Sequence, residues 1–314
     1  MFRTDSSSKL LAIFKDGLSR ILKGNILVVG NMTHTGQHGM YFNSESISPI
    51  EFLEILYEAI EDLKTHIKEQ GTKSIRAVLF KDYFKNDSIH QATKLLIRQG
   101  FYHLDVQPNM VLDIRQHWQT IPDYFNDLNK KYKIRYKRAK KKLGPITLKE
   151  MTTDAILENS DQLYHLYKNV SNKASFNTFI LPKYHFYTYK LQLKDNFRIF
   201  AYYQSGQMIG FFSLIMNKAK LETYFLGYED GHQHTNQLYL NMLYDMISFG
   251  IENGVETIVF ARTALEIKSS VGATPRPMSM YMRHTHPIVN VLLKFIFKVM
   301  NPELIFEERH PFKI

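Results

Sequence analysis

The chain has 314 residues, of which 44% are hydrophobic and 22% are charged. This composition is too apolar for a disordered chain and is typical of a globular protein. The sequence contains no cysteine, which excludes disulfides, zinc–thiolate sites, iron–sulfur clusters and cysteine nucleophiles. At roughly 100–200 residues per domain, the length indicates two domains.

The two ends of the chain predict amphipathic helices. Residues 8–23 place leucines, isoleucine and phenylalanine on one helical face, and the charged residues among them argue against a signal peptide. The apolar run 287–300 is shorter than the ~18–20 residues that a membrane span needs, and it contains Lys294 and Lys298. We therefore expect a cytoplasmic protein. The helix over 288–300 either packs against its domain or lies in the plane of a membrane or at a dimer surface.

The first half of the chain alternates strands and helices. Ser48-Pro49 begins a long helix with one apolar face, and Gly71 ends it. The other expected elements are a strand over 25–30, a strand over 75–80, a helix over 90–98 that ends at Gly100, and one or two strands over 101–114.

The second half repeats part of this order. We expect a helix over 160–173, antiparallel strands over 197–203, 207–216 and 220–228, a helix over 237–253, a strand over 255–261 and a helix over 263–271. Gly254 and Gly272 each end one of the last two expected helices. In the first half, Gly71 and Gly100 end the two expected helices in the same way. The shared order suggests a duplicated α/β unit.

The net charge of +10 arises from one segment. Nine basic residues and no acid lie within 130–142, and apolar residues recur there every three or four positions, which predicts an amphipathic basic helix. Its cationic face is a solvated surface, a site for an anionic ligand or lipid headgroup, or a nucleic-acid surface. We rank nucleic acid last, because no RNA-binding signature or zinc finger accompanies the segment.

Two segments carry a resemblance to a known superfamily. The first segment is 227–240, which begins Gly-Tyr-Glu-Asp-Gly-His-Gln-His-Thr-Asn-Gln, and the second is 254–272, which begins Gly-Val-Glu-Thr-Ile-Val-Phe-Ala-Arg-Thr. Both resemble the C-terminal half of GNAT-type acyltransferases. Together with the basic segment 129–143, they resemble the FemAB-like or BioF2-like branch, whose members have two fused GNAT domains. The resemblance extends over 122–283, and over 25–114 it consists of the order of elements.

The resemblance implies an α/β protein with two tandem GNAT-like domains, each a mixed central sheet flanked by helices. The expected domains are a degenerate one over 1–120 and an acyltransferase domain over 121–314. The implied activity is transfer of an acyl group from acetyl-CoA or a longer acyl-CoA to an amine, with a lipid or cell-envelope precursor as one class of acceptor. Such an acceptor would bring the protein to the inner face of the membrane as a peripheral enzyme.

Two other functions remain open. A Fem-type peptidyltransferase would use aminoacyl-tRNA and give the basic helix an RNA-binding role. A GNAT-like module without activity would bind a glycan or a lipid. We expect no metal ion, because His232 and His234 lack a further ligand at a suitable spacing.

Three residues are candidates for catalysis. Amine attack on an acyl donor requires a base, and Glu222 lies on the strand that resembles the base-bearing strand of GNAT enzymes; the alternative is an ordinary outward glutamate. Tyr228 would protonate the leaving thiolate or is a packing residue. Backbone N–H groups near Leu226 to Tyr228 would hold the oxyanion. Arg262 is the third candidate, because it follows the strand 255–261 at the edge where open α/β sheets bind ligands.

The remaining candidates bind the donor or the acceptor. In GNAT enzymes a Gly-rich loop at a helix N-terminus binds the pyrophosphate of coenzyme A, and the matching residues 232–238 lack those glycines. We still expect the donor to contact Leu226, Gly227, Thr235, Asn236 and Gln237, with Thr235 or Asn236 capping the helix. His234, Thr263, Glu266 and Lys268 are the expected acceptor ligands. Alternatively, Thr263 and Glu266 form a capping box with a structural role only.

Overall fold

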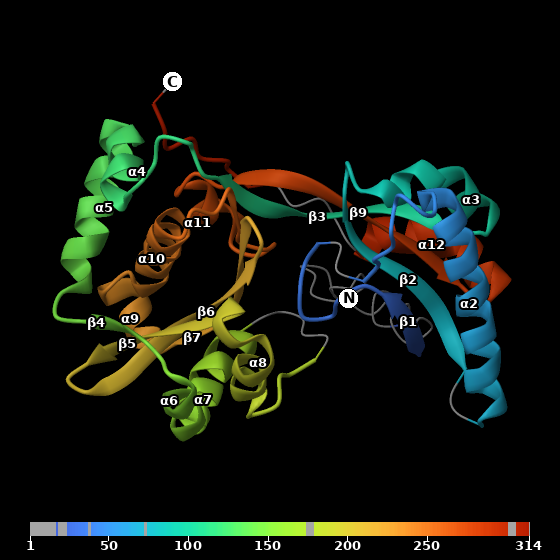
Figure 1. Ribbon diagram of the computed structural model, residues 1–314, viewed down its shortest axis with the longest axis horizontal. Coiled ribbons are helices and arrows are strands. Elements are labelled where there is room, and N and C mark those ends of the chain that lie inside the picture. The colour runs from blue at the N-terminus through green and yellow to red at the C-terminus, as the bar shows by residue number, and fades with distance from the viewer. Residues whose placement is uncertain are drawn as a thin grey trace. The chain divides into compact units, whose positions relative to one another are not determined.

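The computed structural model describes residues 17, 24–36, 39–71, 74–173, 179–300 and 306–313, with residues 298–300 as backbone only. Its strands follow the order β1-β2-β9-β3-β8-β7-β6-β5-β4 and pair in both directions. Helices flank the strands, so the predicted α/β class with a mixed sheet is confirmed (Figure 1). No helix within these ranges is long and apolar enough to cross a membrane. Apart from Gly17, the helix expected over 8–23 lies outside the described residues.

The chain divides into two compact units. Unit 1 comprises Met1–Asn109 and Arg276–Ile305, and unit 2 comprises Met110–Pro275 and Phe306–Ile314. This division differs from the expected boundary between residues 120 and 121, because a late segment of the chain belongs to the first unit. The strands β3 and β9 each contain residues of both units.

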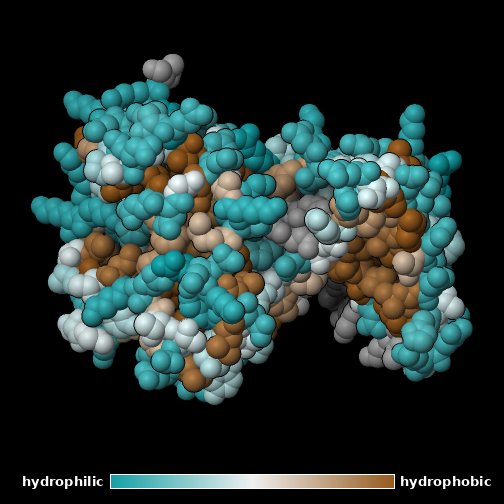
Figure 2. Space-filling view, viewed as in Figure 1, coloured by the Kyte–Doolittle hydropathy of each residue, from teal (hydrophilic) through white to brown (hydrophobic). Residues whose placement is uncertain are grey.

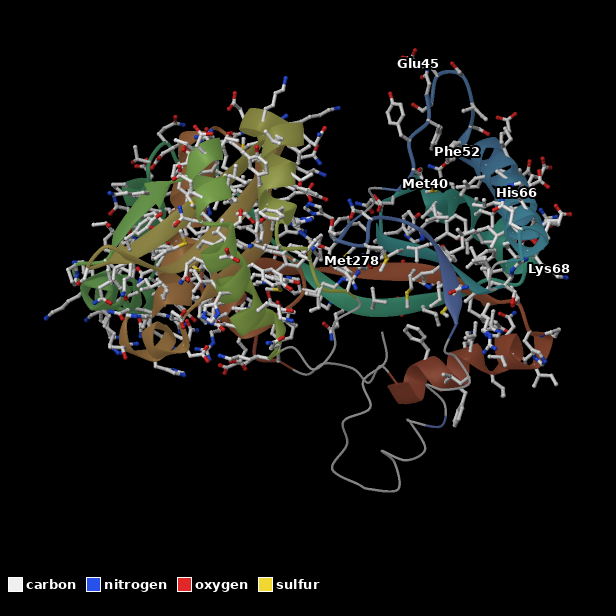
Figure 3. All side chains as sticks on the ribbon, turned by 90° about the horizontal axis from the view of Figure 1, so that it is seen from below. Met40, Glu45, Phe52, His66, Lys68 and Met278 are labelled. Atoms are coloured by element: carbon white, nitrogen blue, oxygen red, sulfur yellow. The ribbon has the colours of Figure 1, made fainter. Side chains whose placement is uncertain are left out.

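Unit 1 contains a parallel pair of strands extended by an antiparallel one. Its elements are β1 (Asn25–Val29), α2 (Pro49–Glu69), β2 (Ile75–Phe84), the short 3-10 helix η1 (Ser88–Ala92), α3 (Thr93–Arg98), most of β3 (Tyr102–Asp113), most of β9 (Thr274–His284) and α12 (Pro287–Met300). β1 runs parallel to β2, and β9 runs antiparallel to β2. Phe42 stacks on Phe52 of α2 at 4.4 Å between ring centroids, which attaches the loop before α2 to that helix. Figure 3 labels Met40 and Glu45 of this segment and Phe52 of the helix.

α2 begins where the sequence predicts. The Ser48 hydroxyl accepts a hydrogen bond from the Glu51 N–H at 3.3 Å, and the Glu51 carboxylate accepts one from the Ser48 N–H at 3.0 Å. This capping box satisfies two N–H groups that a helix leaves open at its N-terminus. The Ser48 hydroxyl, which donates to Glu51 Oε2 at 2.7 Å, and then the Ser48 N–H lower the pKa of Glu51.

α12 has two apolar faces. Leu293, Ile296 and Phe297 are buried in unit 1, as expected for a helix that packs against its domain. A second stripe stays exposed: Ile288 at 68%, Val291 at 70%, Leu292 at 48% and Phe295 at 58%. Of its described residues, one apolar face of α12 therefore packs against the core and the other is exposed.

Unit 2 is built around a run of antiparallel strands. Its elements are α4 (Ile121–Asp127), α5 (Lys130–Leu143), β4 (Thr147–Glu150), α6 (Thr153–Glu158), α7 (Ser160–Ser171), α8 (His185–Leu193), the 3-10 helix η2 (Lys194–Asn196), β5 (Phe197–Gln204), β6 (Gln207–Asn217), β7 (Lys220–Tyr228), α9 (Asp230–Thr235), α10 (Leu238–Glu252), β8 (Thr257–Val259) and α11 (Leu265–Ser269). β4 to β7 are antiparallel neighbours. The predicted strands over 197–228 and the predicted basic helix are confirmed.

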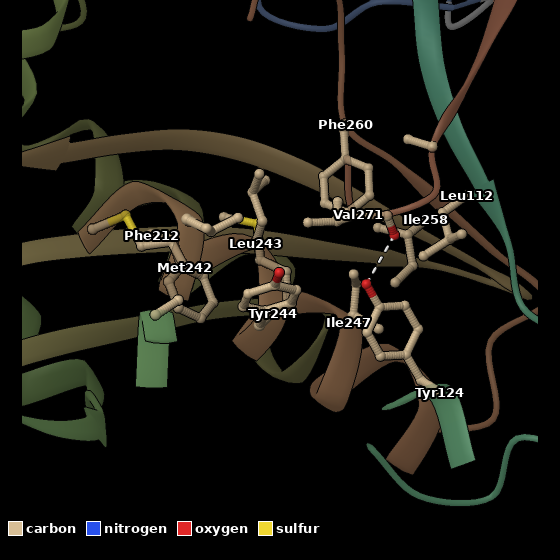
Figure 4. Close-up of a cluster of buried hydrophobic side chains, with 14 of the residues drawn as sticks. Leu112, Tyr124, Phe212, Met242, Leu243, Tyr244, Ile247, Ile258, Phe260 and Val271 are labelled. Carbon is tan, nitrogen blue, oxygen red and sulfur yellow. Dashed lines mark hydrogen bonds between the residues drawn. The ribbon is translucent and has the colours of Figure 1, made fainter. Parts of the chain in front are cut away.

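The main core of unit 2 lies between these strands and the helices α4, α5 and α10. α10 contributes Met242, Leu243 and Ile247, which are at most 1% exposed. A buried tyrosine completes this cluster, because the Tyr124 hydroxyl donates a hydrogen bond to the Val271 carbonyl at 3.1 Å (Figure 4). A second cluster on the opposite face packs α6, α7 and α8 against β5 and β6.

Candidate active site

β7 has an open edge. Along its length β7 pairs with β6, but it pairs with β8 only over Lys220–Glu222. After Val259 the chain turns to β3 instead, since the Phe260 N–H donates to the Met110 carbonyl at 2.8 Å and the Met110 N–H donates to the Ala261 carbonyl at 3.1 Å. From residue 223 to 228, no described strand pairs with the β7 edge that faces away from β6. The N–H and C=O groups of a strand edge are the groups that a bound ligand can pair with.

A bulge interrupts β7 next to this edge. Phe212 of β6 pairs with Leu226 and Leu214 pairs with Thr223, so Tyr224 and Phe225 lie opposite Ser213 alone. The Ser213 hydroxyl donates to the Phe225 carbonyl at 2.6 Å and fixes the extra residue. Bulges of this kind redirect side chains and frequently lie beside active sites.

Glu222 lies where the open edge begins. It is 4% exposed, and Asn217 Nδ2 donates a hydrogen bond to its Oε1 at 2.8 Å. Its neighbours in the sheet are Ile215 of β6 and Val259 of β8. The structure thus places this predicted base on an inner strand in a buried position, which excludes the alternative of an outward glutamate.

Sequence reasoning missed two residues near Glu222. Tyr224 follows it by two positions and packs in the same cluster as Ile215, the cross-strand neighbour of Glu222, so the two side chains share one face of the sheet. The Tyr224 hydroxyl lies 2.8 Å from Nε2 of His185 on α8. Burial lowers the pKa of His185 to about 4, so the imidazole is neutral at pH 7. The adjacent aromatic residues Tyr224 and Phe225, which break the alternation of the strand, were the available signal for the bulge.

Tyr228 lies at the far end of β7 from Glu222. The two residues are six positions apart, which corresponds to about 20 Å along an extended strand. Tyr228 instead packs toward α10, with its ring centroid 6.4 Å from that of Tyr239. Burial raises the pKa of Tyr228, so its phenol stays protonated at neutral pH.

Leu226 and Gly227 have different surroundings. The Glu229 N–H bonds to the Ile209 carbonyl of β6, so strand alternation directs the N–H groups of Leu226 and Tyr228 to the open edge. Gly227 lies directly against α7, because a Cβ atom there would come within 2.3 Å of the Leu166 carbonyl carbon. Its missing side chain permits this close packing, and helix backbone occupies the space beside it.

Two buried basic residues follow β8, Arg262 in the turn and Lys268 in α11. Nε and Nη2 of Arg262 are buried, and burial lowers the pKa of this residue to about 10. Lys268 is 3% exposed, and its Nζ donates a long hydrogen bond of 3.3 Å to the Ala261 carbonyl. Burial lowers the pKa of Lys268 to about 7. Both predicted side chains are therefore inside unit 2, where a charge is costly.

Two further predicted ligands lie on the surface. Thr263 is exposed, and Glu266 forms an ion pair of 3.4 Å with Arg309. The expected capping box is wrong: α11 begins after Ala264, which has a left-handed backbone (φ 55°) and makes no side-chain cap. A threonine at 263 is one residue too early to cap this helix.

The expected donor loop has the form of the short helix α9 followed by α10. His234 and Thr235 are exposed, whereas Asn236 is attached to α5 through a hydrogen bond from its Nδ2 to the Lys142 carbonyl at 2.9 Å. The expected cap is wrong, because the residue before α10 is Gln237, with φ 49° and no side-chain cap.

One N–H group at the start of α10 is already engaged by the protein itself. Gln233 Oε1 already accepts the Tyr239 N–H at 3.1 Å, and the buried Gln237 Oε1 that lies nearby is an acceptor, which would repel a phosphate. The expectation of acyl-CoA as the donor therefore rests on the resemblance in sequence and not on these residues.

Comparison with known proteins establishes the fold. No family model and no curated protein matches the sequence. Among solved structures, L-PGS from Bacillus licheniformis has a TM-score of 0.51 at 11% identity, over 90% of this chain and 84% of that one. FemX has a TM-score of 0.51 at 12% identity, over 78% and 79% of the two chains. A GCN5-related N-acetyltransferase from Kribbella flavida matches with a TM-score of 0.41 at 9% identity, over 90% and 97%. At these identities, the likeness to L-PGS and FemX shows a shared fold.

Proposed function

We propose that this chain is a GNAT-like transferase that moves an acyl or aminoacyl group from an activated donor to an amine. The observation that carries the proposal is the buried Glu222 at the point where β7 parts from β8. A carboxylate beside an open strand edge supplies a proton acceptor and backbone N–H donors within one element. Acyl transfer to an amine needs both.

The proposed step assigns a role to each of these groups. The substrate ammonium loses its proton to Glu222, directly or through one water. The amine nitrogen then attacks the donor carbonyl, so a C–N bond forms, and the carbonyl oxygen gains a negative charge that the Leu226 N–H stabilises. When the carbonyl re-forms, the bond to the leaving thiolate or alkoxide breaks and the leaving group takes up a proton; the nitrogen gives up its second proton to the group that supplied this one, which leaves a neutral amide. We assign the proton on the leaving group to the Tyr224 hydroxyl, because Tyr224 is much nearer to Glu222 along the strand than Tyr228 is.

The donor follows from a binding experiment. Acetyl-CoA, a long-chain acyl-CoA and free coenzyme A are titrated into the purified protein by calorimetry and thermal shift. A ligand at about 100 times its Kd stabilises a protein by about 2.7 kcal/mol. Binding of an acyl-CoA supports a thioester donor. The relative affinities for the three ligands then indicate the length of the acyl group. If none binds, release of free tRNA from aminoacyl-tRNA tests the aminoacyl donor.

Glu222→Gln tests the chemistry. With the donor identified, this variant is expected to keep donor binding and lose turnover by about 10²–10⁴-fold. Glu256→Gln is the matched control, since Glu256 is exposed and precedes β8. Unchanged turnover in Glu222→Gln would refute the assigned base. Binding without turnover in the unmodified protein would instead indicate a binding module without activity.

A further inference from the structure

α5 presents a continuous cationic surface. Its exposed residues are six cations and one isoleucine, namely Lys130, Lys131, Ile134, Lys137, Arg138, Lys141 and Lys142; we call them the α5 face. At 1.5 Å per residue they extend over about 18 Å. Figure 2 shows mostly hydrophilic side chains over the position that α5 has in Figure 1.

The α5 face belongs to a helix that is firmly held on unit 2. Tyr132 and Ala139 are buried beneath it. Lys140, which is not part of the face, forms an ion pair of 2.5 Å with Asp245 of α10. Asn241 of the same helix donates from Nδ2 to the Ala139 carbonyl at 3.0 Å. The cations are therefore displayed on a fixed surface and not on a flexible tail.

The charge of the α5 face is not neutralised by the protein. None of its cations forms an ion pair with an acid among the residues that the structure describes. The nearby Asp127 is engaged by Arg115 at 2.8 Å and by the Trp118 indole at 2.8 Å. Neighbouring Lys133 has a lowered pKa, through desolvation and then through repulsion by Lys313 and Lys137. A multivalent anion would relieve this repulsion.

The side chains of α5 favour a lipid surface over RNA as that anion. Proteins that bind single-stranded RNA expose aromatic rings for base stacking. On α5, Tyr132 is 5% exposed, and the Tyr136 ring packs against Tyr244 with 4.6 Å between centroids. The exposed apolar residue is Ile134, at 57%, in the middle of the cations. An aliphatic side chain surrounded by lysines suits the headgroup region of a bilayer.

We propose that the α5 face docks on a membrane surface rich in anionic phospholipid. The inference does not depend on the proposed enzymatic activity. Its test is flotation of the purified protein with vesicles of phosphatidylcholine, with and without phosphatidylglycerol. We expect binding only to vesicles that contain phosphatidylglycerol, and loss of that binding at high salt, because screening weakens exposed charge interactions.

A triple variant assigns the binding to α5. Each basic residue near an anionic surface raises the binding constant about fivefold. The variant with Arg138→Gln, Lys141→Gln and Lys142→Gln should therefore bind vesicles roughly a hundredfold more weakly. The control variant replaces Lys194, Lys218 and Lys220 by Gln; these lysines are also exposed on unit 2, so the net charge changes equally. Thermal unfolding checks that both variants remain folded.

Three results would overturn the proposal. The first is absence of binding to the anionic vesicles. The second is an equal loss in the two triple variants, which would make the effect one of net charge alone. The third is a protein that binds tRNA and whose α5 triple variant loses tRNA binding but binds vesicles as before. That result would assign the α5 face to RNA.

Discussion

Replacing the buried Lys268 by methionine should change how the stability of the protein depends on pH. In the unfolded chain this lysine has a pKa near 10.5, whereas burial lowers the folded value to about 7. Between these values the unfolded state binds a proton that the folded state does not, so stability rises with pH across the window. The slope is about 1.4 kcal/mol per pH unit, and the whole window amounts to about 5 kcal/mol.

Lys268→Met removes this contribution and keeps a side chain of similar length. We expect the free energy of unfolding, measured in urea, to rise by about 2–3 kcal/mol more for the original protein than for the variant between pH 7.5 and pH 9.5. Other titrating groups are common to both proteins and cancel in the difference. Lys218→Met is the control, because Lys218 is exposed and should leave the slope unchanged. Parallel stability curves for Lys268→Met and the original protein would refute the buried, neutral lysine.

Three other substitutions or measurements test local contacts. Gly227→Ala should lower stability by about 1–3 kcal/mol through the clash of its Cβ with the α7 backbone, whereas Gly231→Ala, with nothing within 4 Å, should be neutral; equal melting temperatures would contradict the close approach. Asp245→Asn should cost about 1–2 kcal/mol by weakening the contact with Lys140, measured by denaturant unfolding at low salt. The His185 imidazole should show no NMR titration between pH 6 and pH 8, because its pKa is about 4; a midpoint near 6.5 would disprove its burial.

The repeating patterns of the sequence predicted most elements of unit 2 and missed a central strand. Alternation and glycine positions located β5, β6 and β7, and Asn253-Gly254 marked the end of α10. No strand was predicted over 274–284, where Pro275 and Pro277 are unusual residues for a central strand. In the structure the prolines fall in the first residues of β9, and the pairing with β2 begins only at Met278.

The site was predictable only in part. Glu222 was identified because one strand carried the resemblance, and its burial agrees with the assigned role. The bulge at Tyr224 and the contact with His185 depend on how β7 meets β6 and α8, and a single sequence does not encode such long-range register in any local pattern. At Thr263 the local pattern was misleading. Thr263 and Glu266 have the spacing of a capping box, but the N-cap of α11 is Ala264, one residue later.

The discontinuous path of unit 1 determines when that unit is completed during synthesis. β2 needs β9 as its antiparallel neighbour, and β9 is synthesised only after β3 to β8. Until then the β2 edge stays uncovered, although the strands β4 to β8 of unit 2 have already been made. During this interval the nascent chain exposes a strand edge that invites wrong pairing, so chaperone binding to the early segment would protect the yield of folded protein.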